Sequence, residues 1–225
     1  MSIKINYLNK KLNKSSSNLI LFSNEKFGLN DFKQYLSNSE FTYINDLLKT
    51  NDLKKNILFF ELSSKKKIFI ISIKNNLKTA DFESLGAEFY KRVNYGKNSE
   101  YFLNSDTVDV KYKNFVSHFL HGLKLKSYEF NKYKTKKNTR VISINVSGNK
   151  NKPSIKNQLR FKALEEGTFF ARDLVSEPGN ILHPDEYAKR LNSLRKDGLK
   201  INIYDKKKLK NLGMNALLGV GMGSI

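Results

Sequence analysis

The chain has 225 residues and a formal net charge of +20, from 41 lysines and arginines against 21 aspartates and glutamates. Its 39% of hydrophobic residues suffices for a packed core, and its length allows one large domain, or one domain with part of another. Its longest apolar runs, such as 57–60 and 68–71, are far shorter than the roughly 20 residues of a membrane-spanning helix. The absence of cysteine excludes disulfides, and with no secretory signal at the N-terminus it favours the cytoplasm.

The positive charge alone does not identify a partner. Lysine and arginine release counterions from phosphate backbones, so a nucleic acid has to be considered. Lysine far outnumbers arginine here, however, and arginine is the residue whose planar fork recognises bases and phosphates. We therefore favour a lysine-rich solvated surface over a nucleic-acid face.

Strands and helices alternate through the first 150 residues. Period-two alternation and short apolar runs predict strands, and apolar residues three and four apart predict helices. The expected strands are 3–7, 18–22, 56–62, 67–73, 101–103 and 140–147. The expected helices are 29–50 with a break at 38–39, a helix capped by Thr79 and ended by Gly96, and 112–123. This order predicts an α/β layered domain with a parallel or mixed sheet, in which 56–62 and 67–73 pair as a hairpin.

The polar segment 148–153 contains glycine and proline and is the expected linker to the second part. A long helix is expected to follow over 154–175. Pro184 is placed at the first turn of the next helix, and Gly198 is placed to close it. The elements expected beyond it are a strand at 200–204, a short helix at 206–212 and a buried apolar strand at 216–221.

Three histidines are candidate metal ligands. His118 and His121 are three residues apart on a predicted helix and can share one of its faces. This spacing differs from the separation by four in a metalloprotease helix, and no third ligand is adjacent. His183 precedes Pro184 at a helix start. We interpret His118 and His121 as surface or half-buried residues and His183 as a capping or loop residue.

The carboxylates and serines also do not form a recognisable catalytic or metal-binding pattern. Glu165 and Glu166 are sequence neighbours, so they point to different sides of their helix and cannot share a metal. Asp106 and Asp109 lie near a helix start, where capping explains them. The serines without an adjacent base are Ser176, Ser193 and Ser224.

Two further patterns have competing interpretations. Gly219, Gly221 and Gly223 follow an expected strand but lack the last spacing of a dinucleotide motif, so we favour a close-packed strand end. The basic segment 124–140 carries aromatic residues on which bases could stack. We favour a structural connection for it.

The residues from 164 to 224 resemble the M17 leucyl aminopeptidases. The matching stretches are ARDLVSEPGNILHPDEYAKRL from Ala171 and LGMNALLGVGMGS from Leu212. The family usually has Thr-Pro-Ala-Asn where this chain has Glu-Pro-Gly-Asn at 177–180. A more moderate similarity covers 108–146, where a family pattern of a helix end followed by aromatic residues is matched by Gly122, Tyr128, Phe130, Tyr133 and Lys134.

The resemblance implies a macro-like N-terminal α/β sandwich at 1–150, a linker helix at 151–176, and the incomplete beginning of an α/β zinc-peptidase domain at 177–225. Similar proteins are hexamers that remove N-terminal amino acids, leucine among the favoured ones, from peptides. They use a water activated by two divalent metal ions, zinc or manganese.

By the same resemblance, the lysines, carboxylates and arginine that perform this chemistry match positions beyond Ile225. We therefore assign no catalytic, metal-binding or cofactor-binding residue, and we expect the chain alone to bind no metal and to be inactive. Whether it acts as an enzyme stays open. The alternatives are a stand-alone binding or assembly module for a partner aminopeptidase or DNA, and a degraded gene product.

Overall fold

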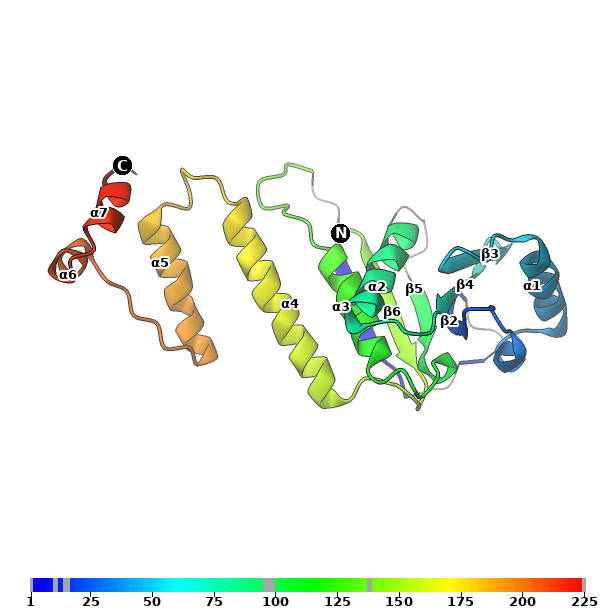
Figure 1. Ribbon diagram of the computed structural model, residues 1–225. Helices are drawn as coiled ribbons and strands as arrows, with labels where there is room; N and C mark the ends of the chain where they lie inside the picture. Colours follow the sequence, from blue (N-terminus) through cyan, green and yellow to red (C-terminus); the bar gives the residue numbers. More distant parts are fainter. Residues whose placement is uncertain (1, 10–11, 14–16, 95–99, 137–138, 224–225) are drawn as a thin grey trace. The chain divides into compact units, whose positions relative to one another are not determined.

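A computed structural model describes the chain apart from residues 1, 10–11, 14–16, 95–99, 137–138 and 224–225 (Figure 1). The chain divides into two compact units, Met1–Thr168 and Phe169–Ile225, which are described separately below. Within the described ranges, no helix is both long enough and apolar enough to span a membrane. The division expected from the sequence, at 150 and 176, stays a prediction.

The first unit is a six-stranded sheet with helices on it. Its strands are β1 (Ser2–Tyr7), β2 (Leu19–Asn24), β3 (Ile57–Ser63), β4 (Lys66–Ile73), β5 (Glu100–Asn104) and β6 (Val141–Ser147). Its helices are α1 (Asn38–Thr50), α2 (Thr79–Val93), α3 (Phe115–Lys126) and the larger part of α4 (Ile155–Ser176), with 3-10 turns η1 (Asn30–Phe32) and η2 (Ser105–Thr107). The predicted α/β architecture is confirmed.

The strand order is β1-β6-β5-β2-β4-β3. All neighbours are parallel except β3 and β4, which form the predicted antiparallel hairpin. The first strand of the chain therefore pairs with the last strand of the sheet, with Ser2 opposite Val141 and Tyr7 opposite Val146. Strand β2 lies in the interior, between β4 and β5.

The two faces of β2 serve two separate apolar cores, because successive side chains of a strand point to opposite faces. Ile20 and Phe22 belong to the core that α2 and α3 cover. Leu19 and Leu21 belong to the core that contains Ile44 of α1. All four β2 side chains are at most 1% exposed. The helices thus cover both faces of the sheet, α2 and α3 on one and α1 on the other.

Helices α2 and α3 meet through glycine on both sides (Figure 1). A Cβ atom built on Gly86 of α2 would lie 1.9 Å from the backbone oxygen of Phe119, and one built on Gly122 of α3 would lie 1.9 Å from the backbone oxygen of Glu83. No side-chain carbon fits at either point. The two glycines therefore allow the helix backbones to touch, which sets the spacing between the two helices.

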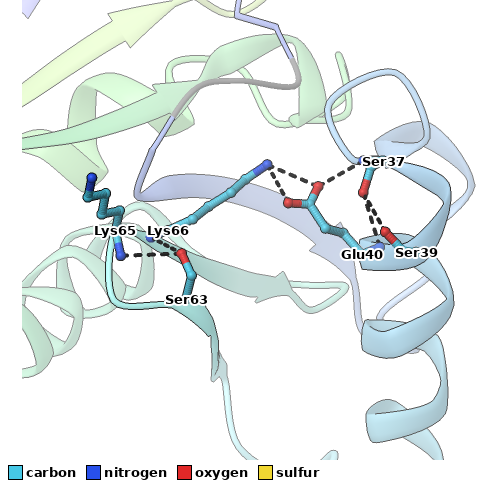
Figure 2. A network of polar contacts seen from close by, with 6 residues as sticks. All are labelled: Ser37, Ser39, Glu40, Ser63, Lys65 and Lys66. Atoms are coloured by element: carbon cyan, nitrogen blue, oxygen red, sulfur yellow. Dashed lines mark hydrogen bonds and ion pairs between the residues drawn. The ribbon is translucent and has the colours of Figure 1, made fainter.

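The start of α1 is fixed to the β3–β4 hairpin by a polar network (Figure 2). The Ser37 backbone N–H donates to the Glu40 carboxylate at 2.8 Å, and the Glu40 N–H donates to Ser37 Oγ at 3.2 Å, which is a capping box. Lys66 Nζ lies 2.8 Å from Glu40 Oε1. Burial works to raise the pKa of Glu40, but hydrogen bonds from Lys66 and Ser37 together lower it.

Two helix starts differ from the sequence interpretation. The N-cap of α2 is Lys78 and not Thr79, because the Asp81 carboxylate accepts the Lys78 N–H at 2.7 Å and this fixes the turn one residue earlier. Helix α3 begins at Phe115, after Asn114 in a left-handed conformation, and not at residue 112. Gly96, the expected end of α2, lies outside the described residues.

The second unit contains the end of α4, then α5 (Pro184–Ser193), η3 (Leu194–Asp197), α6 (Lys206–Asn211) and α7 (Asn215–Met222). Pro184 at the first turn of α5 and the left-handed Gly198 after η3 are as predicted. The strands expected at 200–204 and 216–221 are wrong: the first range has no regular structure, and the second lies within α7. A short apolar run fits a helix as well as a strand.

Candidate functional site

The histidines of α3 each meet a different carboxylate. His118 Nδ1 lies 2.9 Å from Glu83 Oε1 on α2, whereas His121 Nδ1 lies 3.6 Å from Glu165 Oε1 on α4. The ring of Phe161 on α4 contacts both imidazoles, at centroid distances of 4.8 Å and 5.0 Å. The histidines share a face of α3, as expected, but they hold α3 to two neighbouring helices and do not converge on a common point.

His121 is more enclosed than the sequence indicated. We expected a surface or half-buried residue; His118 is half-buried, but His121 is buried, and its Nδ1 has no hydrogen-bond partner within the described ranges. Glu165 is buried beside it while Glu166 is exposed, so these two carboxylates diverge as predicted. Burial, and then the negative charge of Glu165, raise the pKa of Tyr7 to about 12. The Glu165 carboxylate is thus buried beside His121 of α3 and close enough to Tyr7 of β1 to affect its pKa.

The described residues do not suit a two-metal centre. A protein site for zinc or a similar ion needs three or more converging side-chain ligands. In the ranges that the structure covers, no group of three histidines, aspartates or glutamates comes together in this way. No chemical step can therefore be assigned to a metal on these residues.

One feature of the first unit with the form of a binding site is a cavity of about 530 Å³. It lies at the carboxyl ends of four adjacent parallel strands, in the order β6, β5, β2 and β4. It is lined by the strand ends and the loops after them, at residues 12, 22–24, 28, 31, 34–35, 73, 104, 106–112, 147–148 and 150. We call it the strand-end cavity.

The position of the strand-end cavity follows from the topology. After β2 the chain passes to α1 on one face of the sheet, whereas after β5 it passes to α3 on the other face. Because β2 and β5 are neighbours, the two connections diverge and leave a crevice between the strand ends. Open α/β sheets bind their ligands at such a point.

Asp106 lines the strand-end cavity and joins two of its loops. Its Oδ1 accepts the backbone N–H groups of Asn149 and Lys150 at 2.7 Å and 2.6 Å, which fixes the loop after β6 to η2. Gly148 has a positive φ of 115°, and a Cβ there would lie 2.4 Å from Ser105 Oγ. The capping role expected for Asp106 is wrong: Asn104 caps η2, and the Asp106 carboxylate instead joins two loops that are far apart in sequence.

The other sequence candidates are separate from this cavity. Asp109 lines it, but its Oδ1 accepts the Lys111 N–H at 3.0 Å in a local turn. Phe130 and Tyr133 lie in the segment that connects α3 to β6, with ring centroids 5.8 Å apart. His183 is the N-cap residue of α5, without a capping hydrogen bond from its side chain.

The three glycines near the C-terminus have a different setting from the one expected. Gly219 and Gly221 lie within α7, and Gly223 is its C-cap. Space around Gly219 and Gly221 is open, so the interpretation as a close-packed strand end is wrong. Of the three serines, Ser176 ends α4, Ser193 donates to the Arg190 backbone oxygen, and Ser224 lies outside the described residues.

Arg190 forms ion pairs with two carboxylates of the second unit. Its Nη1 lies 2.7 Å from the Glu177 carboxylate, and its Nε lies 2.9 Å from Glu186 Oε1. The side chain of Glu177 is only 1% exposed. The hydrogen bond from Arg190 lowers the pKa of Glu186. The Glu-Pro-Gly-Asn turn after α4 is thereby held to α5 by one charged side chain.

Comparison of the chain with known proteins shows which family it matches. Residues 169–225 match the family model described as "Cytosol aminopeptidase family, catalytic domain". The chain is 40% identical over 107 residues to a probable cytosol aminopeptidase of Bradyrhizobium, which covers 46% of the chain and 21% of the relative. It is 34% identical over 155 residues to that of Nitrobacter winogradskyi, which covers 66% and 31%. The chain belongs to the M17 cytosol aminopeptidase family.

Solved structures of the family have the same fold. A tomato leucine aminopeptidase variant superposes over 94% of this chain and 46% of its own, with a TM-score of 0.69 at 18% identity. The cytosol aminopeptidase of Coxiella burnetii superposes over 92% and 41%, with a TM-score of 0.62. The chain spans less than half of each solved structure, and its sequence matches cover less than a third of these curated relatives.

Proposed function

We propose that the chain is the N-terminal portion of a leucyl aminopeptidase, which removes N-terminal amino acids from peptides by two-metal hydrolysis. The observation that carries this proposal is the match of residues 169–225 to the family's catalytic domain, directly after an α/β unit that has the fold of the same enzymes. When bound, two divalent ions, zinc or manganese, would polarise the scissile carbonyl and lower the pKa of a water. One structural neighbour is titled as a complex with Mn.

On this proposal the described residues support the enzyme without performing its reaction. No three potential ligands converge within the ranges described, so we expect the chain alone to bind no catalytic metal and to be inactive. We further propose a cytoplasmic location, peptide substrates, and assembly of the complete enzyme as a homo-hexamer. Size-exclusion chromatography with light scattering on a complete relative and on this chain tests the assembly.

A chimera tests the proposed function. The 225 residues replace the aligned portion of the Coxiella burnetii enzyme, and hydrolysis of leucine p-nitroanilide is measured with manganese or zinc. We expect the chimera to hydrolyse the substrate and to lose activity with a chelator, while the 225-residue chain alone shows no turnover. A chimera that folds and assembles but is inactive, or metal-dependent turnover by the chain alone, would contradict the proposal.

A second candidate function is a binding or assembly module without catalysis, either for a partner aminopeptidase or for DNA. The strand-end cavity and the charge of +20 favour it. Co-purification with a complete M17 enzyme tests the first partner. A DNA duplex titrated at two salt concentrations tests the second, because binding through phosphates weakens steeply with salt.

A further inference from the structure

We propose that the strand-end cavity binds a small zwitterion of the α-amino acid class, with an apolar side chain. The inference does not depend on the proposed function. It rests on an unpaired polar group in the wall of the cavity, on two charges of opposite sign that line the same cavity, and on an apolar wall.

The unpaired group is the amide of Asn104, the last residue of β5. Asn104 lines the cavity and is 2% exposed. Its Oδ1 accepts the backbone N–H of Asp106 at 3.0 Å, so its NH₂ is turned the other way. This NH₂ has no acceptor within the described ranges. Among the described residues, the fully buried side-chain atoms without a hydrogen-bond partner are Ser105 Oγ and His121 Nδ1, so the Asn104 nitrogen is not fully enclosed by protein. The amide therefore offers two hydrogen-bond donors to a molecule in the cavity.

Charges of opposite sign line the same cavity as Asn104. Lys150 lines the cavity from the loop after β6, and Asp31 lines it from the segment after β2, while β5 lies between these two strands. Neither the Lys150 ammonium nor the Asp31 carboxylate has an ion-pair or hydrogen-bond partner among the described side chains. A ligand with a carboxylate near Lys150 and an ammonium near Asp31 would satisfy both groups.

The other charged groups of the cavity are already engaged within the protein. Asp106 accepts two backbone N–H groups, as described above. Asp109 Oδ2 lies 4.0 Å from Lys111 Nζ, which also donates to Asn75 Oδ1 at 3.1 Å. These internal partners leave Lys150 and Asp31 as the pair for a ligand.

The wall of the cavity also carries apolar side chains. Phe22 of β2 and Ile73 of β4 contribute from the strand ends, and Tyr35 and Val108 contribute from the loops. All four are at most 7% exposed, so each presents only a small apolar area to the cavity. An aromatic or branched aliphatic side chain of a ligand would contact this area, and the volume of about 530 Å³ lies in the range of small-molecule sites.

The test uses three probes of nearly equal size on the intact 225-residue chain, by calorimetry and by NMR titration. L-Phenylalanine carries both charges, 3-phenylpropanoate lacks the ammonium, and 2-phenylethylamine lacks the carboxylate. We expect L-phenylalanine to bind and each single-charge probe to bind about tenfold more weakly or not at all, since each loses a charge-assisted hydrogen bond.

Variants locate the site. Lys150→Gln and Asp31→Asn should each weaken L-phenylalanine binding about tenfold, without a change in the unfolding midpoint, because both side chains are exposed. Lys54→Gln and Asp197→Asn are the matched controls, being exposed residues that do not line the cavity. Asn104→Asp keeps an oxygen that accepts the Asp106 N–H but replaces the NH₂ donor, so it should also weaken L-phenylalanine binding. If this variant does not fold, the Lys150 and Asp31 variants alone locate the site.

Three outcomes would overturn the inference. The first is a folded chain that shows no binding of L-phenylalanine up to its solubility limit. The second is equal binding of the zwitterion and the single-charge probes, or equal losses in the site and control variants. The third is binding of adenosine monophosphate to a chain that does not bind L-phenylalanine, which would assign the cavity to a nucleotide.

Discussion

Replacement of Gly86 by alanine should separate α2 from α3. The new Cβ would lie 1.9 Å from the backbone oxygen of Phe119, and Cβ contacts below 3.0 Å essentially never occur. The obstacle is backbone and cannot rotate away, so the helices must move apart by about 1.1 Å, the difference between these two distances. The perturbation therefore reaches every side chain packed between them.

The cost can be estimated from that separation. A gap of 0.5–1 Å removes about a quarter to a half of a dispersion contact, and full burial of a Leu or Phe side chain contributes about 1.5–3 kcal/mol. Four such side chains lie in this core, at Phe82, Leu85, Phe89 and Phe119, so the loss is about 1.5–6 kcal/mol. Alanine returns about 1 kcal/mol through its helix propensity. We expect a net loss of about 3 kcal/mol, out of a typical total of about 5–15 kcal/mol.

Urea unfolding followed by far-UV circular dichroism measures this change. The matched control is Gly167→Ala in α4, where a Cβ meets nothing within 4 Å, and which should stabilise by up to about 1 kcal/mol. Gly122→Ala should resemble Gly86→Ala, and the double variant should cost less than the sum, because one separation relieves both clashes. A Gly86→Ala protein that unfolds at the same urea concentration as wild type would refute the close contact of the backbones.

Glu40→Gln should make the free energy of unfolding depend less on pH in the acid range. Hydrogen bonds from Lys66 and other donors outweigh burial and lower the pKa of Glu40 in the folded state, so Glu40 stabilises the fold fully above its unfolded pKa of about 4.3 and this stabilisation is lost as the pH falls through the lower folded value. Urea unfolding at a series of pH values measures this. Equal pH profiles for both proteins would contradict this. Gly148→Ala should cost about 1–3 kcal/mol, since φ is 115° and the Cβ would lie 2.4 Å from Ser105 Oγ; an unchanged thermal midpoint would show that the loop adapts. Limited proteolysis with mass spectrometry should show cleavage first in the second unit, because its described residues include no buried hydrophobic side chain. A fragment that contains residues 1–168 should survive. Loss of that fragment before the second unit is cleaved would argue against a stable core in the first unit.

The first unit could be predicted from its sequence because its apolar pattern is both regular and consistent with burial. The alternation at 3–7 predicted β1, since alternate side chains of a strand have a fixed face. The apolar run 67–73 predicted β4 because isoleucine and phenylalanine, which favour strands, dominate it. The segment 216–221 lacked such a constraint. An uninterrupted apolar run has no period, so the sequence could not distinguish the strand we expected from helix α7.

The candidate site was harder to predict because its parts are distant along the chain. Asn104 ends β5, whereas Asp31 follows β2 and Lys150 follows β6, and only the order β6-β5-β2 brings these strand ends together. Likewise, the pairing of His121 with Glu165 depends on how α4 packs against α3. No local spacing encodes either arrangement. A search for strands that end in asparagine or serine could have suggested the cavity, without its charges.

The place of β1 beside β6 has a consequence for biosynthesis. Strand β1 is synthesised long before its partner, Val141–Ser147, and within the described ranges no other strand borders it in the sheet. At about 5–20 residues per second, the nascent chain carries β1 without that partner for roughly 7–28 s. Its backbone N–H and C=O groups are unpaired in that interval and could join a second nascent chain. Lys4 and Asn6 on one side of this strand make such a pairing less favourable. Insertion of β1 is thus expected to be a late step that completes the sheet only once β6 has been made.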